Sequence, residues 1–263
     1  MVKSMKNIKL FIQEFVKSNI LFHSAQNAFY FVLSIFPFLY LVTKVFPFIP
    51  LPSDGIIRAI KLLVPDEALR IIYSSFKSIS QTPLTSRSLP YVLIALWSSS
   101  MLIYSLKSAF ATFYKERALK SKILTRLFSI ALTTLILFAV LLTFISVFFI
   151  NLGLNILTNH FLINYSPILL SVISLILISF DVILLYIILP PVRITILKAL
   201  PGAVTSVITL TIFSYGFSYY VSHIADYSRF YGAMGSIVIL LLWVYISSVI
   251  ILSGGLINAK FSK

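Results

Sequence analysis

Residues 234 to 259 of the chain read MGSIVILLLWVYISSVIILSGGLINA, a run without a charged side chain. The hydrocarbon core of a bilayer is about 30 Å thick, and a helix that rises about 1.5 Å per residue crosses it in about 20 residues. This run therefore predicts a transmembrane helix. Similar runs, bounded by charged or turn residues, lie at residues 24 to 49, 89 to 114, 127 to 152, 167 to 189 and 201 to 221. We expect an all-α integral membrane protein with six transmembrane helices in a single domain, residues 1 to 263.

The composition excludes an ordinary soluble protein. Of the 263 residues, 59% are hydrophobic and only 11% are charged, whereas a soluble chain carries roughly 25% charged residues to cover its surface. The chain has no Cys, which excludes disulfides, thiol nucleophiles and thiolate metal sites.

The basic residues predict the orientation. Thirteen lie in the N-terminal segment, between spans 2 and 3, between spans 4 and 5, and after span 6; six lie in the other connections. Because Lys and Arg concentrate in cytoplasmic connections, both termini are expected in the cytoplasm. The net charge of +14 is thus spread over short connections, which favours anionic lipid headgroups over nucleic acid as the partner.

Two amphipathic helices are expected outside the spans. The first precedes span 1 and carries an apolar stripe of Ile8, Ile12, Phe15, Asn19 and Phe22, which suits a helix in the inner headgroup layer. The second begins at Pro65 and Asp66 in the long outer connection and carries the stripe Leu69, Ile72, Phe76 and Ile79. It is expected to pack over the span ends or to lie on the outer leaflet; a gate or lid is the alternative.

Two ionisable residues lie deep in the predicted spans. Asp181 and Lys107 stand at similar depths, roughly 10 to 12 Å from the cytoplasmic ends of spans 4 and 2. A charge at the centre of a span costs roughly 2.5 to 3.5 kcal/mol, so each needs a partner, a route to water or a function. We expect a pair between them, with snorkelling of Lys107 as the alternative. Asp181 fits a structural ion pair and a proton-coupled or substrate-binding carboxylate equally well.

Span 1 is unusually polar. It carries Ser24, Gln26, Asn27, Tyr30 and Ser34. These side chains predict either one wall of a polar cavity or an interior helix that packs through small polar groups.

Several positions predict kinks or close packing of the helices. A kink is expected at Pro37, because proline removes a backbone donor and clashes with the preceding turn. Gly232, Gly235 and Gly254, near the two ends of span 6, predict close approach of neighbouring helices.

The sequence shows none of the motifs typical of hydrolases, zinc enzymes or nucleotide-driven pumps. Its three His residues, His23, His160 and His223, stand on different connections. No catalytic residue, metal or cofactor is therefore expected, and the chain is not expected to be an enzyme.

Several local patterns resemble the YihY/BrkB family of bacterial inner-membrane proteins, long labelled ribonuclease BN, over nearly the whole chain. The patterns are the segments 24 to 30 and 34 to 37, Trp97 to Ser100, Leu189-Pro190 with Arg193, Pro201 to Ala203, Tyr227-Ser228, Tyr231 to Ser236, Leu242 to Tyr245 and Gly254 to Asn258. Leu256 stands where the family commonly has a glutamate, so a mechanism that needs this carboxylate does not transfer. The resemblance implies six spans, cytoplasmic termini and, by analogy with some members, envelope lipid traffic.

The expected function is movement of a lipid or anionic envelope component between leaflets. Asp181, Lys107, Arg193, Gln26, Asn27, Tyr30 and Ser34 are the candidates for the substrate path. The alternatives are a non-transporting scaffold for envelope assembly and, more remotely, a membrane ribonuclease. Homo-oligomers or envelope-assembly proteins are possible partners.

Overall fold

The computed structural model describes residues 2–45, 65–81, 89–116, 146, 167–223 and 234–261. Within these ranges the chain forms seven helices and no strand. They are α1 (Val2–Lys17), α2 (Ile20–Val45), α4 (Asp66–Ser80), α5 (Leu89–Tyr114), α7 (Pro167–Ile188), α8 (Ile196–His223) and α10 (Gly235–Phe261). The all-helical class is confirmed for this part of the chain.

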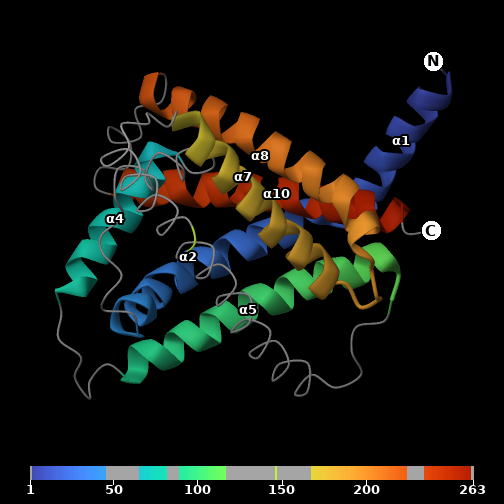
Figure 1. Ribbon diagram of the computed structural model, residues 1–263. Helices are drawn as coiled ribbons and strands as arrows, with labels where there is room; N and C mark the ends of the chain where they lie inside the picture. Colours follow the sequence, from blue (N-terminus) through green and yellow to red (C-terminus); the bar gives the residue numbers. More distant parts are fainter. Residues whose placement is uncertain are drawn as a thin grey trace.

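The long helices form a bundle in which most contacting pairs are antiparallel, whereas α5 and α10 are in contact and run parallel (Figure 1). α2 and α8 run one way, whereas α5, α7 and α10 run the other way. α5 and α7 are thus parallel, so Glu116 and Pro167 lie at opposite ends of the bundle, as a span between them requires. That predicted span, residues 127 to 152, lies outside the described residues except for Ser146 and stays a prediction.

Two helices, α8 and α10, are long and apolar enough to cross a membrane by length and composition. α2, α5 and α7 contain 26, 26 and 22 residues, which gives lengths of about 33 to 39 Å. α5 occupies the expected residues 89 to 114, and α7 and α10 agree with the expected ends to within two residues. α2 and α8 begin four and five residues earlier than expected.

The early start of α2 follows from a break after α1. Asn19 has a φ of 50°, in the left-handed region that Asn tolerates better than most residues. α1 therefore ends at Lys17, and the N–H of His23 donates to the carbonyl of Asn19 as the next helix begins. The expected single stripe from Ile8 to Phe22 is wrong in this respect, because Asn19 and Phe22 do not belong to α1.

α1 is anchored on one side only. Phe11 and Phe15 pack against the core, and the ammonium of Lys260 lies 5.2 Å from the centroid of the Phe11 ring. Ile12 and Val16 are exposed, so α1 presents a second apolar face away from the bundle.

α4 begins at Asp66 after Pro65, as the start signal predicted. It packs across the end of the bundle opposite to the C-terminus, against α2 and α10 (Figure 1). Its buried Ala68 joins a cluster with Phe217, Leu240 and Trp243. The expectation of a helix over the span ends is confirmed.

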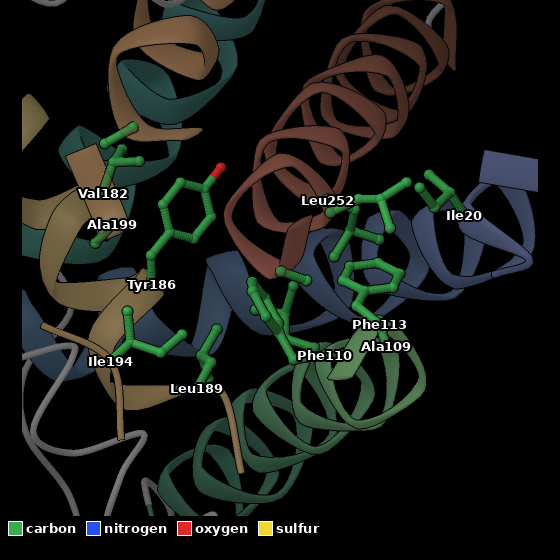
Figure 2. Packing of buried hydrophobic residues seen from close by; sticks show 14 of the residues in the cluster. Ile20, Ala109, Phe110, Phe113, Val182, Tyr186, Leu189, Ile194, Ala199 and Leu252 are labelled. Carbon is green, nitrogen blue, oxygen red and sulfur yellow. The ribbon is translucent and has the colours of Figure 1, made fainter. Parts of the chain in front are cut away.

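A second apolar cluster occupies the other end of the bundle. It joins Ile20 of α2, Phe110 of α5, Tyr186 of α7, Ala203 of α8 and Leu252 of α10. Figure 2 shows part of this cluster, with the Tyr186 hydroxyl pointing from α7 toward α10.

Candidate functional site

A line of uncharged polar side chains runs between α2, α5 and α10. We call it the polar seam; its members are Ser24, Gln26, Asn27 and Ser34 of α2, Ser98 and Ser105 of α5, and Ser248 of α10. All are buried except Gln26, which is half-buried. Spacings of three and seven residues place Ser24, Asn27 and Ser34 on one face of α2, and Ser98 and Ser105 on one face of α5. Gln26 lies on the neighbouring face of α2. The seam therefore follows from the helical period of the sequence.

Two hydrogen bonds join the helices across the seam. The side-chain amide of Asn27 donates to Ser248 Oγ at 2.9 Å, which connects α2 to α10. The hydroxyl of Ser105 donates to Gln26 Oε1 at 3.1 Å, which connects α5 to α2. Neighbouring residues of α2 thus face different partners, and α2 packs against α5 and α10, which also contact each other.

Three buried atoms of the seam have no hydrogen-bond partner among the described residues. They are Ser24 Oγ, Asn27 Oδ1 and Ser98 Oγ, on side chains that are 0%, 2% and 1% exposed. A buried polar group without a partner costs about 1 to 3 kcal/mol. Such groups in native proteins need a water, an ion or a ligand to explain them.

The register of the helices spreads these atoms along the length of α2. Ser98 precedes Ser105 by two helical turns, about 10 Å along the axis. Because α5 is antiparallel to α2 and Ser105 meets Gln26, Ser98 lies near the level of Ser34. The hydroxyl of Ser34 donates to the carbonyl of Phe31 in its own helix. From Ser24 to Ser34 the seam covers about 15 Å of α2, about half of a hydrocarbon core.

A second polar cluster ties α7, α8 and α10 together. The hydroxyl of Tyr186 donates to the carbonyl of Ile251 at 2.7 Å and lies 2.7 Å from Ser206 Oγ. Because Tyr186 has one hydroxyl hydrogen, Ser206 is the donor to Tyr186 Oη when both bonds form. Tyr186 is fully buried, so one phenol joins three helices.

Asn258 binds the backbone of α8 on both sides of Pro201. Gly202 N–H donates to Asn258 Oδ1 at 2.7 Å, and Asn258 Nδ2 donates to the carbonyl of Ala199 at 3.0 Å. Pro201 has no N–H and disturbs the preceding turn, and in an apolar environment backbone groups must find other partners. Asn258 provides them, which explains how α8 begins at Ile196 and continues through Pro201.

Two glycines permit this crossing. A Cβ on Gly254 would collide with Ser206 Oγ, Tyr186 Oη and the carbonyl of Gly202. A Cβ on Gly202 would collide with the carbonyl of Gly254 and with the Asn258 side chain. Gly254 was singled out as a close-packing candidate, and a side chain at this position would meet α7 and α8. We call Tyr186, Gly202, Ser206, Gly254 and Asn258 the helix junction.

The other candidates for the substrate path lie outside the seam, on α2, α5, α7 and the link between α7 and α8. Asp181, Lys107 and Tyr30 are half-buried, and Arg193 is exposed on the link between α7 and α8. Both Asp181 and Lys107 take part in interactions, and a pair between them stays a prediction. Ser34 belongs to the seam.

The hinge and packing candidates have mixed outcomes. Pro37 lies within α2, its side chain is outside the described part, and the predicted kink is not tested. Gly235 is buried at the start of α10, whereas Gly232 is outside the described residues. Leu256, which stands at the family's glutamate position, is buried in the apolar cluster.

Sequence reasoning missed the roles of Tyr186, Ser206 and Asn258. The available signal was a single polar residue within a long apolar run, which in membrane helices is typical of a contact between helices. Among the described residues, no three His, Asp or Glu side chains form a group that could hold a metal ion.

Comparison with known proteins gives a consistent result. The profile of the family described as Virulence factor BrkB matches residues 11 to 263. The putative ribonuclease-like protein YfkH of Bacillus subtilis (strain 168) is 33% identical over 254 residues, covering 91% of this chain and 89% of YfkH. A UPF0761 membrane protein of Xanthomonas campestris pv. campestris (strain B100) is 37% identical over 81 residues, covering 31% of this chain and 19% of that protein. No solved structure matches.

Proposed function

The chain belongs to the BrkB family of membrane proteins, and from this premise we propose that it moves a lipid or an anionic envelope component between the leaflets of the bacterial inner membrane. A polar headgroup crosses the hydrocarbon core only along a route that offers it hydrogen bonds. The polar seam is that route, with α2 as its central wall.

The observation that carries the proposal is the set of unpartnered atoms at Ser24, Asn27 and Ser98. A scaffold with a dry interior gains nothing from three buried polar groups that each cost free energy. A transporter needs them, because they bind water or a headgroup when the helices separate. The seam therefore favours transport over the scaffold.

The distribution of charge supports the proposed orientation. Five cations are exposed: Lys17, Lys115, Arg193, Lys198 and Lys260. They stand at the end of α1, just after α5, between α7 and α8, at the start of α8 and at the end of α10. Figure 1 draws these helix ends on the side of the bundle that holds the C-terminus. Cytoplasmic ends of membrane proteins carry such an excess of cations. In this orientation both termini are cytoplasmic, and the cations attract anionic headgroups from the inner leaflet toward the seam.

Asp181 and Lys107 are assigned a supporting role in this proposal. Both are half-buried in helices of the bundle, where ionisable side chains mark ion or substrate paths more often than elsewhere. Asp181 is the group that would couple movement to a proton gradient, since the chain shows no nucleotide-binding motif.

The test is a lipid translocation assay in proteoliposomes with labelled anionic and zwitterionic lipids. Wild type is expected to move at least one lipid well above protein-free vesicles, and Asp181→Asn is expected to lose that activity. Unchanged activity in Asp181→Asn refutes the role of Asp181. Background traces for every lipid with wild type refute lipid movement and favour the scaffold.

A further inference from the structure

We propose that the polar seam binds the hydroxyl groups of an anionic lipid whose headgroup is a glycerol or a sugar, in preference to headgroups without hydroxyls. The inference rests on the proposed lipid cargo and names its chemical class. Its basis is the hydrogen-bonding capacity that the seam leaves unused.

The unpartnered atoms define what the occupant must provide. Asn27 Oδ1 is an acceptor only, whereas Ser24 Oγ and Ser98 Oγ each donate one hydrogen and also accept. One N–H of the Asn27 side chain donates to Ser248. The three atoms are spread over about 15 Å of the seam. An occupant must therefore donate at least to Asn27 Oδ1, and it can donate to or accept from the serine hydroxyls within its reach.

The absence of charge in the seam excludes some lipid headgroups. None of its seven members is ionisable. A quaternary ammonium group, as in choline, has no N–H or O–H to donate. A primary ammonium has donors, but its full charge would be buried here without a carboxylate of the seam beside it, which is unfavourable. Hydroxyl groups fit, because they donate and accept without a charge.

The cations near one end of the seam indicate that the ligand carries a negative charge. Ser24 and Asn27 lie in the first two turns of α2, the end of the bundle where the exposed Lys17 and Lys260 also lie. A phosphodiester held near these cations leaves its hydroxyl-bearing substituent free to reach into the seam. The matching ligand thus combines one negative charge with hydroxyl groups.

Ordered water offers the same O–H chemistry, so the experiment must separate the two sources. We would measure retention of three lipids with equal acyl chains by the purified full-length protein, using native mass spectrometry. The probes are phosphatidylglycerol, phosphatidylmethanol and phosphatidylcholine. Phosphatidylmethanol is the matched control, because it carries the same charge as phosphatidylglycerol without its hydroxyls.

We expect phosphatidylglycerol to be retained about fivefold better than phosphatidylmethanol, since this is about 1 kcal/mol of hydrogen bonding. The Ser24→Ala/Ser98→Ala variant should lose this preference while it folds normally, because neither hydroxyl has a partner among the described residues. Ser100→Ala is the control: its hydroxyl bonds to the carbonyl of Trp97 in its own helix, and its preference should remain.

Equal retention of phosphatidylglycerol and phosphatidylmethanol by wild type overturns the inference and leaves the seam to water. A preference that survives in Ser24→Ala/Ser98→Ala overturns the assigned location. Suppose that this variant loses the preference but that wild type translocates no lipid. The binding site would then stand, and the proposed function would be refuted. The two failures are therefore distinguishable.

Discussion

Two glycines inside helices provide the sharpest test of the helix junction. Gly254 lies in α10 where a Cβ would meet Tyr186 Oη, Ser206 Oγ and the carbonyl of Gly202, whereas a Cβ on Gly216 of α8 would meet nothing within 4 Å. The same substitution, Gly→Ala, should therefore have opposite effects at the two positions. The comparison holds the chemistry constant and varies only the packing.

The magnitudes follow from three contributions. Alanine is favoured over glycine within a helix by about 1 kcal/mol, and this is the whole effect expected for Gly216→Ala. In Gly254→Ala the same gain is offset by overpacking, about 1 to 3 kcal/mol, and by loss of the Tyr186 hydrogen bonds, about 1 kcal/mol each. We expect a net destabilisation of about 2 to 4 kcal/mol, which lowers Tm by about 4 to 16 °C for a chain of this size.

The assay is thermal unfolding of the purified variants in one detergent, followed by size-exclusion chromatography of heated samples. Gly216→Ala should unfold at or slightly above the wild-type temperature, and Gly254→Ala clearly below it. If Gly254→Ala is as stable as Gly216→Ala, the close crossing of α8 and α10 is wrong.

Three other predictions follow from the same structure. Asn258→Leu removes the partners of Gly202 N–H and the Ala199 carbonyl, so it should lower the free energy of unfolding by about 2 to 4 kcal/mol. Its control, Ser253→Ala, loses only a bond to Val249 of its own helix and should be near neutral. Equal Tm values for the two variants would contradict the account. Tyr186→Phe and Ser206→Ala should be non-additive in a double-mutant cycle by about 1 kcal/mol, because they share one hydrogen bond; strict additivity would rule out that bond. In this chain without Cys, Arg193→Cys should react with an impermeant thiol reagent only from the cytoplasmic side and His223→Cys only from the outer side; labelling of both from one side would refute the orientation.

Hydropathy and helical period predicted most of the described fold. α5 was located at its observed ends, and the amphipathic pattern after Pro65 located α4. These features depend on local sequence alone, since an apolar run of span length or a stripe at helical spacing is visible without knowledge of the neighbours.

Most of the features that were missed depend on distant partners. Pro201 was expected to begin a helix, but α8 begins five residues earlier because Asn258, 56 residues beyond Gly202, binds the backbone around it. Asn19 was placed on a helical stripe, although it adopts a left-handed conformation that ends α1. Hydropathy carries no information about the register between helices, so the partners of Tyr186 could not be predicted.

The polar seam was predicted only in part. Ser24, Gln26, Asn27 and Ser34 were recognised as one polar wall, but the sequence left open whether they pack against protein or line a cavity. Their partners, Ser105 and Ser248, are identified only by the contacts of α5 and α10 with α2.

The most direct test of the central claim is whether water reaches the seam in a membrane. Ser98→Cys and Ser100→Cys can each be made in the Cys-free chain and exposed to a small, charged methanethiosulfonate reagent in proteoliposomes. Both positions are buried. Residues two positions apart in a helix point to nearly opposite faces, and only Ser98 belongs to the seam. The account predicts that Ser98→Cys is modified and Ser100→Cys is protected; equal protection of both would show a dry seam and contradict a transport route between α2 and α5.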